Sequence, residues 1–393
     1  MNSKRLLFTL TLGAVVGLLS ATSGPASVTG GAPSSTRSDS AVTSAVPKSV
    51  VDLGTLGGSM SSAMALNNWG DVVGLSTTSE GNTHAFLWTK HDGMTDLGTL
   101  PGYTTSFGRA VNDSRQVAGY IQGPNATHAF LWSKQGGMVD LGTLGGRSSD
   151  VRDINEQGQV VGYAETADST HAALWTRAGG IVDLGTLGGG TSAASFVNDW
   201  GQVVGNTFTA NGENHPFLWT RQNGMIDLGT LGGSGAFVAG INNRGQVVGM
   251  SWMADGSTHP FSWTARGGMI DLGTLGGTYA YAAAVNDLGQ VVGYSSMAGG
   301  GTHAFLWTKE SGMTDLGAFS PYAINNLGQV VGQVGDKASH HACVWTTRAG
   351  LVTLDGLGGA YSTGVDVDFF GQIAGYSTTP DGDTHAVLWT TSR

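Results

Sequence analysis

The sequence predicts an all-β protein, an eight-bladed β-propeller built from four-stranded repeats of about 44 residues. Three observations predict this fold: one motif recurs eight times, each copy reads as four short strands, and the chain ends hold complementary parts of one copy. A tryptophan marks every copy, at Trp88, Trp132, Trp175, Trp219, Trp263, Trp307, Trp345 and Trp389. Six of the seven gaps between them are 43 or 44 positions and the other is 38, a period typical of propellers and solenoids.

Each repeat divides into four strand-like segments. In the sixth copy they are residues 279–287, 289–296, 302–308 and 312–319. These runs are short, rich in apolar, β-branched or aromatic residues, and bounded by Gly, Asn, Asp or Ser, which is the pattern of strands joined by tight turns. Small residues dominate the first segment of each copy, so we expect it to be the innermost strand.

The ends of the array favour a ring over a solenoid. Residues 50–58 form a fourth segment with no third segment before it, and residues 385–393 form a third segment with no fourth after it. In a ring, the first segment completes the last blade and removes two open strand edges. Seven complete copies and one shared copy therefore predict eight blades.

Two copies depart from the pattern. The seventh is shortened, because Asp315 and Asn325 lie 10 positions apart where Asp271 and Asn286 lie 15 apart. Its inner strand and entry loop should be short. In the second copy Arg115 replaces a turn glycine, which predicts a strained or altered turn.

The first 47 residues precede the array. Lys4 and Arg5, an uncharged apolar run at 6–19 and a small-residue site at 21–23 predict a secretory signal peptide over 1–23. The alternative is a retained membrane anchor, but a run of 14 residues is short for a span. The Ser-, Thr-, Gly- and Ala-rich segment 24–47 predicts a disordered linker, and 48–393 the propeller. We expect a secreted, extracellular protein.

Charge and cysteine content restrict the partners. The array after residue 48 holds 14 basic and 27 acidic residues, a net charge of −13. Such a surface argues against nucleic acid and anionic membranes as partners. Cys343 is the only cysteine, so no intramolecular disulfide can form, and we expect a monomer.

The recurring polar residues predict structural roles rather than chemistry. One histidine occurs per copy, at His84, His128, His171, His215, His259, His303, His341 and His385. An aspartate recurs one strand later, at Asp52, Asp96, Asp140, Asp183, Asp227, Asp271 and Asp315, with Thr353 in the eighth place. These residues and the repeat tryptophans predict one buried hydrogen-bond set per blade. The alternative is metal sites or acid–base pairs, but a group repeated in every blade cannot converge on one substrate. We expect no metal, no cofactor and no catalytic residue among them.

Recognition should lie where the copies differ. The connections between second and third strands, and those between blades, share one face and vary most. The binding candidates are Tyr103, Tyr279, Tyr281 and Tyr361 with, further along the inner strands, Arg109 and Arg152. The two arginines occupy matching places in adjacent copies and suit a carboxylate or sulfate group. The alternative pairs Arg152 with Asp150 or Asp153 and leaves Arg109 solvated.

The combined motifs His-Ala-Phe-x-Trp, Asp-Leu-Gly-Thr-Leu-Gly-Gly and Ile-Asn-x-x-Gly-Gln-Val-Val-Gly over residues 50–393 resemble the HAF family of extracellular bacterial repeat proteins. The resemblance implies secretion and a repeat array. The family carries no established activity or catalytic residues, so the resemblance transfers neither to this chain.

These observations predict a secreted, non-enzymatic scaffold that binds an extracellular glycan or protein through one propeller face. Two alternatives stay open. One is a polysaccharide-active enzyme, for which Asp150, Asp153 and Asp366 are the inner-strand acids. The other is a purely structural surface protein. Binding without turnover favours the first, and release of reducing ends favours the enzyme.

Overall fold

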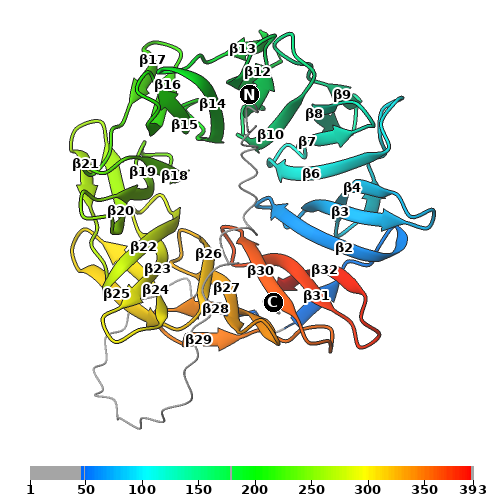
Figure 1. The fold of residues 1–393 in the computed structure, drawn as a ribbon. Coiled ribbons are helices and arrows are strands. Elements are labelled where there is room, and N and C mark those ends of the chain that lie inside the picture. Colours follow the sequence, from blue (N-terminus) through cyan, green and yellow to red (C-terminus); the bar gives the residue numbers. More distant parts are fainter. Residues whose placement is uncertain (1–45, 48, 178, 391–393) are drawn as a thin grey trace, which may run out of the picture. The chain divides into compact units, whose positions relative to one another are not determined.

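The computed structural model describes residues 46–47, 49–177 and 179–390, all within one compact unit, Thr43–Arg393. The predicted signal peptide and all but the last residues of the predicted linker lie outside this range. The described residues form 32 strands and no helix (Figure 1). Accordingly, they include no helix that could cross a membrane.

The strands follow one another as eight antiparallel four-stranded blades around a central channel (Figure 1). The first four blades are blade 1, β2 (Gly57–Leu66), β3 (Val72–Thr78), β4 (Thr83–Thr89) and β5 (Gly93–Asp96); blade 2, β6 (Thr105–Val111), β7 (Val117–Gln122), β8 (Thr127–Ser133) and β9 (Gly137–Asp140); blade 3, β10 (Ser149–Ile154), β11 (Val160–Glu165), β12 (Thr170–Thr176) and β13 (Gly180–Asp183); blade 4, β14 (Gly188–Val197), β15 (Val203–Thr209), β16 (Asn214–Thr220) and β17 (Gly224–Asp227).

The other four are blade 5, β18 (Ala236–Ile241), β19 (Val247–Trp252), β20 (Thr258–Thr264) and β21 (Gly268–Asp271); blade 6, β22 (Gly276–Val285), β23 (Val291–Met297), β24 (Thr302–Thr308) and β25 (Gly312–Gly317); blade 7, β26 (Ser320–Ile324), β27 (Val330–Gly335), β28 (His340–Thr346) and β29 (Gly350–Thr353); blade 8, β30 (Ser362–Val367), β31 (Ile373–Thr378), β32 (Thr384–Thr390) and β1 (Ser49–Asp52). Strand β26 has five residues, where β22 has ten. The shortened seventh inner strand is therefore confirmed.

The N-terminal strand closes the ring, as predicted. Strand β1 pairs antiparallel with β32, with Val50 opposite Trp389 and Asp52 opposite Val387. His385 Nδ1 lies 2.9 Å from the Asp52 carboxylate, across 333 residues of sequence. Val46 also packs against the core of this blade, so the packed array begins slightly before residue 48.

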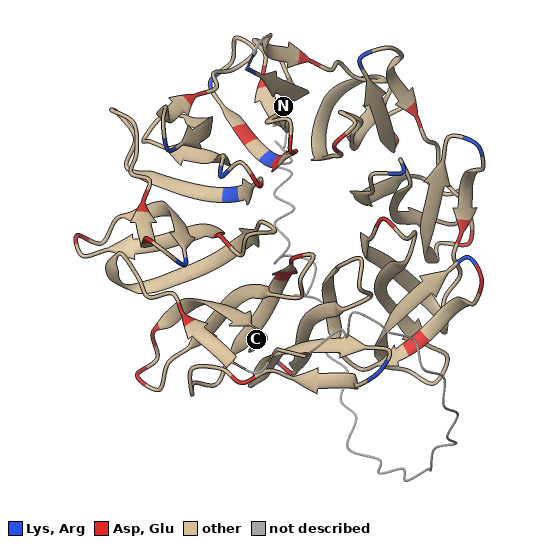
Figure 2. Ribbon diagram, turned by 180° about the vertical axis from the view of Figure 1, so that it is seen from behind, with Lys and Arg blue, Asp and Glu red and all other residues tan. Residues whose placement is uncertain are grey.

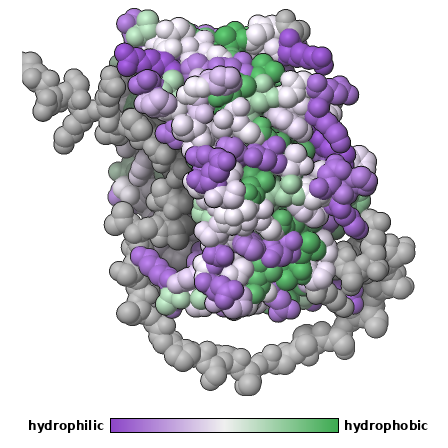
Figure 3. Space-filling view, turned by 90° about the vertical axis from the view of Figure 1, so that its right-hand side faces the viewer, coloured by the Kyte–Doolittle hydropathy of each residue, from purple (hydrophilic) through white to green (hydrophobic). Residues whose placement is uncertain are grey.

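The hydrophobic core lies between the blades, with one cluster at each seam. In five blades the phenylalanine of the third strand lies in this core. These fully buried residues are Phe86, Phe130, Phe217, Phe261 and Phe305. Where Ala173 or Val387 replaces that phenylalanine, the repeat tryptophan of the same strand is buried as well. On the outer rim the fourth strands expose some apolar side chains, such as Val139, and the face drawn in Figure 3 carries both hydrophobic and hydrophilic areas.

A belt of asparagines joins consecutive blades at the turns between first and second strands. We call these residues the asparagine belt: Asn67, Asn112, Asn155, Asn198, Asn242, Asn286 and Asn325. Each Nδ2 donates to the backbone carbonyl of the equivalent residue in the next blade, at 2.8–3.1 Å. Asp368 holds the eighth place, and an ionised carboxylate cannot donate. At that seam, Leu66 N donates to Asp366 Oδ2, a bond that the seam of blades 3 and 4 has in addition to its asparagine bond.

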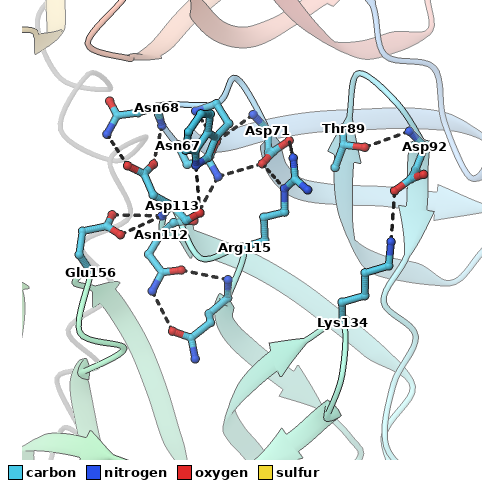
Figure 4. A network of polar contacts seen from close by, with 12 residues as sticks. Asn67, Asn68, Asp71, Thr89, Asp92, Asn112, Asp113, Arg115, Lys134 and Glu156 are labelled. Atoms are coloured by element: carbon cyan, nitrogen blue, oxygen red, sulfur yellow. Dashed lines mark hydrogen bonds and ion pairs between the residues drawn. The ribbon is translucent and has the colours of Figure 1, made fainter.

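The altered turn of the second copy is stabilised by a compensating residue in blade 1. Arg115 adopts a left-handed φ of 58°, which a residue with a side chain rarely takes. Its Nε lies 2.7 Å from Asp71 Oδ2, and the Asp71 side chain is only 3% exposed (Figure 4). In later blades a glutamine stands where Asp71 stands and packs against the turn glycine of the next blade, as Gln116 does against Gly158. The shorter aspartate makes room for Arg115 and pairs with it.

A second seam contact shows the same matching between neighbours. The backbone N–H of Ala85 donates to the buried Ser106 Oγ of the next blade at 2.8 Å, and four other seams repeat this bond. Proline has no such N–H. After Pro216 and Pro260, the next blades carry buried Ala236 and Ala280 in place of the serine, so no hydroxyl is left without its partner.

Candidate functional site

The channel is bordered by the inner strands, and a β-bulge in every one of them leaves one residue outside the strand pairing. The pairing of first and second strands shifts register at the same place in all eight blades, for example between Gly108 and Ala110 and between Val151 and Asp153. The residues at the shift are Met64, Arg109, Arg152, Ser195, Ala239, Ala283, Tyr322 and Val365. None of them is buried. Bulges commonly direct side chains into functional sites, and in two adjacent blades the residue at the bulge is an arginine.

The structure brings Arg109 and Arg152 together with two tyrosines that sequence reasoning missed. The Arg109 guanidinium lies 5.1 Å from the ring centre of Tyr120, and that of Arg152 lies 5.5 Å from the ring centre of Tyr163. These are cation–π distances. Both tyrosines stand at one position of the second strand, so comparing the copies could have found them. In Figure 2 blue segments mark the inner strands β6 and β10, which border the channel.

Asp150 completes this channel cluster, which we define as Arg109, Tyr120, Asp150, Arg152 and Tyr163. Asp150 Oδ2 lies 3.8 Å from the Arg152 guanidinium and accepts a hydrogen bond from the Tyr163 hydroxyl at 3.2 Å. Its Oδ1 is buried without a partner among the described residues. Arg109 has no ion pair in the described part of the chain. The cluster therefore combines one neutralised cation with one available cation.

The pKa values of the tyrosines reflect this arrangement. Burial raises the pKa of Tyr163 to about 12, and the Asp150 charge adds to the effect. Burial also raises the pKa of Tyr120, while Arg109 opposes the rise. Both arginines influence both tyrosines, so the charges of blades 2 and 3 act at one place. Both phenols stay protonated at neutral pH and serve as ring faces and hydroxyl donors.

The four tyrosines predicted for the variable face do not converge. Tyr103 lies 5.6 Å from the His128 ring within blade 2, and Tyr361 lies 5.0 Å from His340 at the seam of blades 7 and 8. The Tyr279 hydroxyl forms a hydrogen bond with the Thr302 hydroxyl, and the ring centres of Tyr281 and Tyr294 lie 5.2 Å apart. They belong to three separate parts of the ring, and no single site contains them all.

The repeat histidines pair with the repeat aspartates in seven blades, at 2.7–3.0 Å from Nδ1. The histidine side chains are 15–32% exposed. The pairs are therefore half-buried, whereas the sequence predicted a buried hydrogen-bond set. No hydrogen bond among the described residues joins a repeat tryptophan to these pairs. Each aspartate also accepts the N–H of the glycine two positions later, as Asp315 does from Gly317 at 2.8 Å, which fixes the turn between blades. His341, opposite Thr353, lies beside Ser339 instead.

Replacing His303 with alanine should lower the free energy of unfolding by about 1 kcal/mol, because a half-exposed charge-assisted bond is lost and water can solvate Asp315. Urea denaturation measures this, with His91→Ala as the control at an exposed histidine outside the repeat set. A chelator should leave both proteins unchanged. A stoichiometric bound transition metal would contradict the assignment.

Asp153 and Asp366 occupy matching places after the bulge and hold seams together. Asp153 Oδ2 accepts the N–H of Val197 in the next blade at 3.0 Å, and its Oδ1 accepts that of Ile154 at 2.8 Å. Asp366 bonds in the same way to Leu66 and Val367. Burial raises the pKa of both carboxyls, that of Asp153 to about 6. Backbone contacts thus occupy Asp153 and Asp366, two of the three inner-strand acids named for the enzyme alternative.

The folded-state pKa of Asp153 predicts a pH-dependent loss of stability. The unfolded chain releases this proton first, because its pKa is about 3.8, so stability falls as pH rises from about 4 to 6. Between pH 4.5 and 7.5 the wild type should lose about 2 kcal/mol more than Asp153→Ala. Other blades carry alanine at this place, at Ala65, Ala110, Ala284 and Ala323. Parallel pH profiles for the two proteins would contradict the prediction.

Two cavities open at the end of the ring that carries the tight turns, which we call the turn face. One, of about 740 Å³, lies at the channel mouth. Its rim carboxylates serve the seams, as when Glu156 accepts the N–H of Asp113 (Figure 4). The other, of about 520 Å³, lies over blade 4 and is flanked by residues of blades 3 and 5. The variable loops predicted to bind a ligand lie on the opposite face. Within the described residues, no group of His, Cys, Asp and Glu could hold a metal ion.

Comparison with known proteins supports the fold. No protein-family model and no curated protein matches the chain. Among solved structures, 133 chains match. They include dipeptidyl peptidase 4 of Porphyromonas gingivalis, with 9% identity and a TM-score of 0.54 over 86% of this chain, and the Dos1 propeller, with 10% identity and a TM-score of 0.51 over 88% of this chain and 95% of that one.

A puromycin-hydrolysing peptidase of Mycobacterium tuberculosis matches 86% of this chain with 12% identity and a TM-score of 0.50. This chain spans 58% of the length of the dipeptidyl peptidase and 63% of that of the puromycin-hydrolysing enzyme. At these identities the likeness shows the propeller fold alone.

Proposed function

We propose that this protein is a secreted, non-enzymatic binding scaffold whose channel cluster takes an anionic group of an extracellular glycan or protein. The residues at the β-bulges of the inner strands are the main support for this proposal. Eight residues occupy the same bulge position on the strands that border the channel, and only Arg109 and Arg152 among them are charged. In an array of net charge −13, two neighbouring guanidiniums over tyrosine faces suit a carboxylate or sulfate.

The chemistry of the cluster supports binding over turnover. Asp150 is held by Arg152 and Tyr163, and Asp153 and Asp366 accept backbone N–H groups at the seams. The enzyme alternative requires a carboxylate free to exchange protons with substrate. Secretion rests on the predicted signal peptide, and the scaffold role also fits the resemblance to the HAF repeats.

The test is binding of the mature protein to immobilised heparin and alginate, which present sulfate and carboxylate groups. The Arg109→Ala/Arg152→Ala variant should bind at least tenfold more weakly, and Arg109→Ala, which keeps the Arg152–Asp150 pair, should bind more weakly with an unchanged melting temperature. The matched control, Lys309→Ala/Arg348→Ala, removes two exposed cations from the turns of blades 6 and 7 and should bind as the parent does. Equal binding by both double variants, or no binding by the parent, would overturn the channel assignment.

A further inference from the structure

We propose that the groove over blade 4, flanked by residues of blades 3 and 5, binds an acidic oligosaccharide, with Trp200 as the stacking platform. The groove has a volume of about 520 Å³ and is lined by Trp200, Trp219, Gln159, Gln202, Arg221 and Arg244 among others. It opens on the turn face and shares no residue with the channel cluster. The inference therefore stands apart from the proposed function.

Trp200 is held in place with most of its ring exposed. It occupies the third position of the turn between β14 and β15, and it is 77% exposed. Its Nε1 donates to the carbonyl of Asn243 in blade 5 at 2.9 Å, so the indole is fixed across the seam. The half-buried Trp219 adds a second aromatic surface. A fixed, exposed indole offers the apolar face of a sugar ring a large contact area at little cost in side-chain entropy.

The amides beside the indoles offer hydrogen-bond donors. Gln159 Oε1 accepts from Asn155 Nδ2, and Gln202 Oε1 accepts from Asn198 Nδ2, both at 2.7 Å. The amide oxygens are thus committed to the asparagine belt. Neither Nε2 group makes a hydrogen bond to the described residues, and neither is among the buried unpaired atoms. Both amide nitrogens can donate to sugar hydroxyls.

Two arginines make the groove positive in an acidic protein. Arg221 lies in the turn after β16 and Arg244 in the turn after β18, and both are exposed. Neither takes part in an ion pair within the described ranges, and the groove lining contains no Asp or Glu. Guanidinium groups bind carboxylates with two parallel hydrogen bonds. The combination of indole faces, amide donors and guanidiniums selects a sugar acid over a neutral sugar.

The position of the groove is unique in the repeat. The third turn residues of blades 1 to 8 are Trp69, Ser114, Gln157, Trp200, Arg244, Leu288, Leu327 and Phe370. A tryptophan followed by an arginine in the next blade occurs only from blade 4 to blade 5. The repeat provides an equivalent turn in every blade, and Trp200 with Arg244 distinguishes this pair of neighbouring turns from the other seven.

A local spectroscopic readout tests the site. We expect trigalacturonate to shift the ¹⁹F resonances of Trp200 and Trp219 in the 5-fluorotryptophan-labelled protein, assigned from their absence in Trp200→Phe and Trp219→Phe, and to leave the Trp69 resonance in place. Maltotriose, a neutral trisaccharide, should shift none of them. Trp200→Ala and Arg221→Ala/Arg244→Ala should each weaken trigalacturonate binding at this site at least tenfold, with melting temperatures unchanged.

The matched control is Trp69→Ala, because the Trp69 Nε1 also bonds to the backbone of the next blade, at Asp113 O. This variant and Arg109→Ala/Arg152→Ala should keep the Trp200 shift, and the heparin and alginate test of the channel cluster is therefore made in a Trp200→Ala background, which separates the two sites. Absence of a Trp200 shift at millimolar trigalacturonate would overturn the proposal. So would an equal response to maltotriose, or the same loss in Trp69→Ala.

Discussion

Removing the N-terminal strand should open the ring and cost the propeller at least about 5 kcal/mol of its free energy of unfolding. A protein that begins at residue 57 lacks β1, the His385–Asp52 pair and the buried side chain of Leu53. Strand β32 then presents an unpaired edge, which also favours aggregation. Thermal unfolding and size-exclusion chromatography measure both effects.

The matched protein for this experiment begins at residue 46. It removes the linker but keeps Val46, which packs against the last blade, and it should melt like the longer protein. Equal melting temperatures for proteins that begin at residues 46 and 57 would contradict closure by β1.

Replacing Asn198 with alanine should remove about 3–4 kcal/mol, the largest effect we expect from a single residue. This buried side chain makes four hydrogen bonds. Its Nδ2 donates to Gln202 Oε1 and to the carbonyl of Asn242 in the next blade, and its Oδ1 accepts the N–H groups of Trp200 and Gln202. Alanine leaves both backbone N–H groups without this partner.

Two further variants show which hydrogen bonds of Asn198 account for the loss of stability. Asn198→Asp keeps an oxygen acceptor but loses the donor to the next blade, as at Asp368, and should cost less than alanine. Gln157→Ala removes an exposed amide of the neighbouring turn and should change stability little. An Asn198→Ala protein as stable as Gln157→Ala in urea would show that the asparagine belt does not hold the seams.

Sequence reasoning reached the architecture because the repeat carries it. The tryptophan spacing and the complementary ends at 50–58 and 385–393 predicted eight blades and closure, and the short interval from Asp315 to Asn325 predicted the short β26. Each of these features is a distance along the chain, which a sequence displays directly.

Contacts between blades were harder to predict, because they join residues about 44 positions apart whose side chains must be compared across copies. The Asp71–Arg115 pair could have been found this way, since Asp71 replaces a recurring glutamine where the next copy loses its glycine. The bulge that holds Arg109 and Arg152 depends on strand register. The exposure of the His–Asp pairs depends on how the blades pack, and so does the groove beside Trp200. Neither can be predicted from the residues of a single repeat.

The most direct test of binding without turnover measures retention and reducing ends in the same samples. The mature protein is incubated with heparin, alginate and neutral dextran at several protein concentrations. The account predicts retention of the acidic glycans, weakened by Arg109→Ala/Arg152→Ala, with no increase in reducing ends over time. Reducing ends that accumulate in proportion to protein concentration, and that disappear in Asp153→Ala, would contradict it and assign the channel to an enzyme.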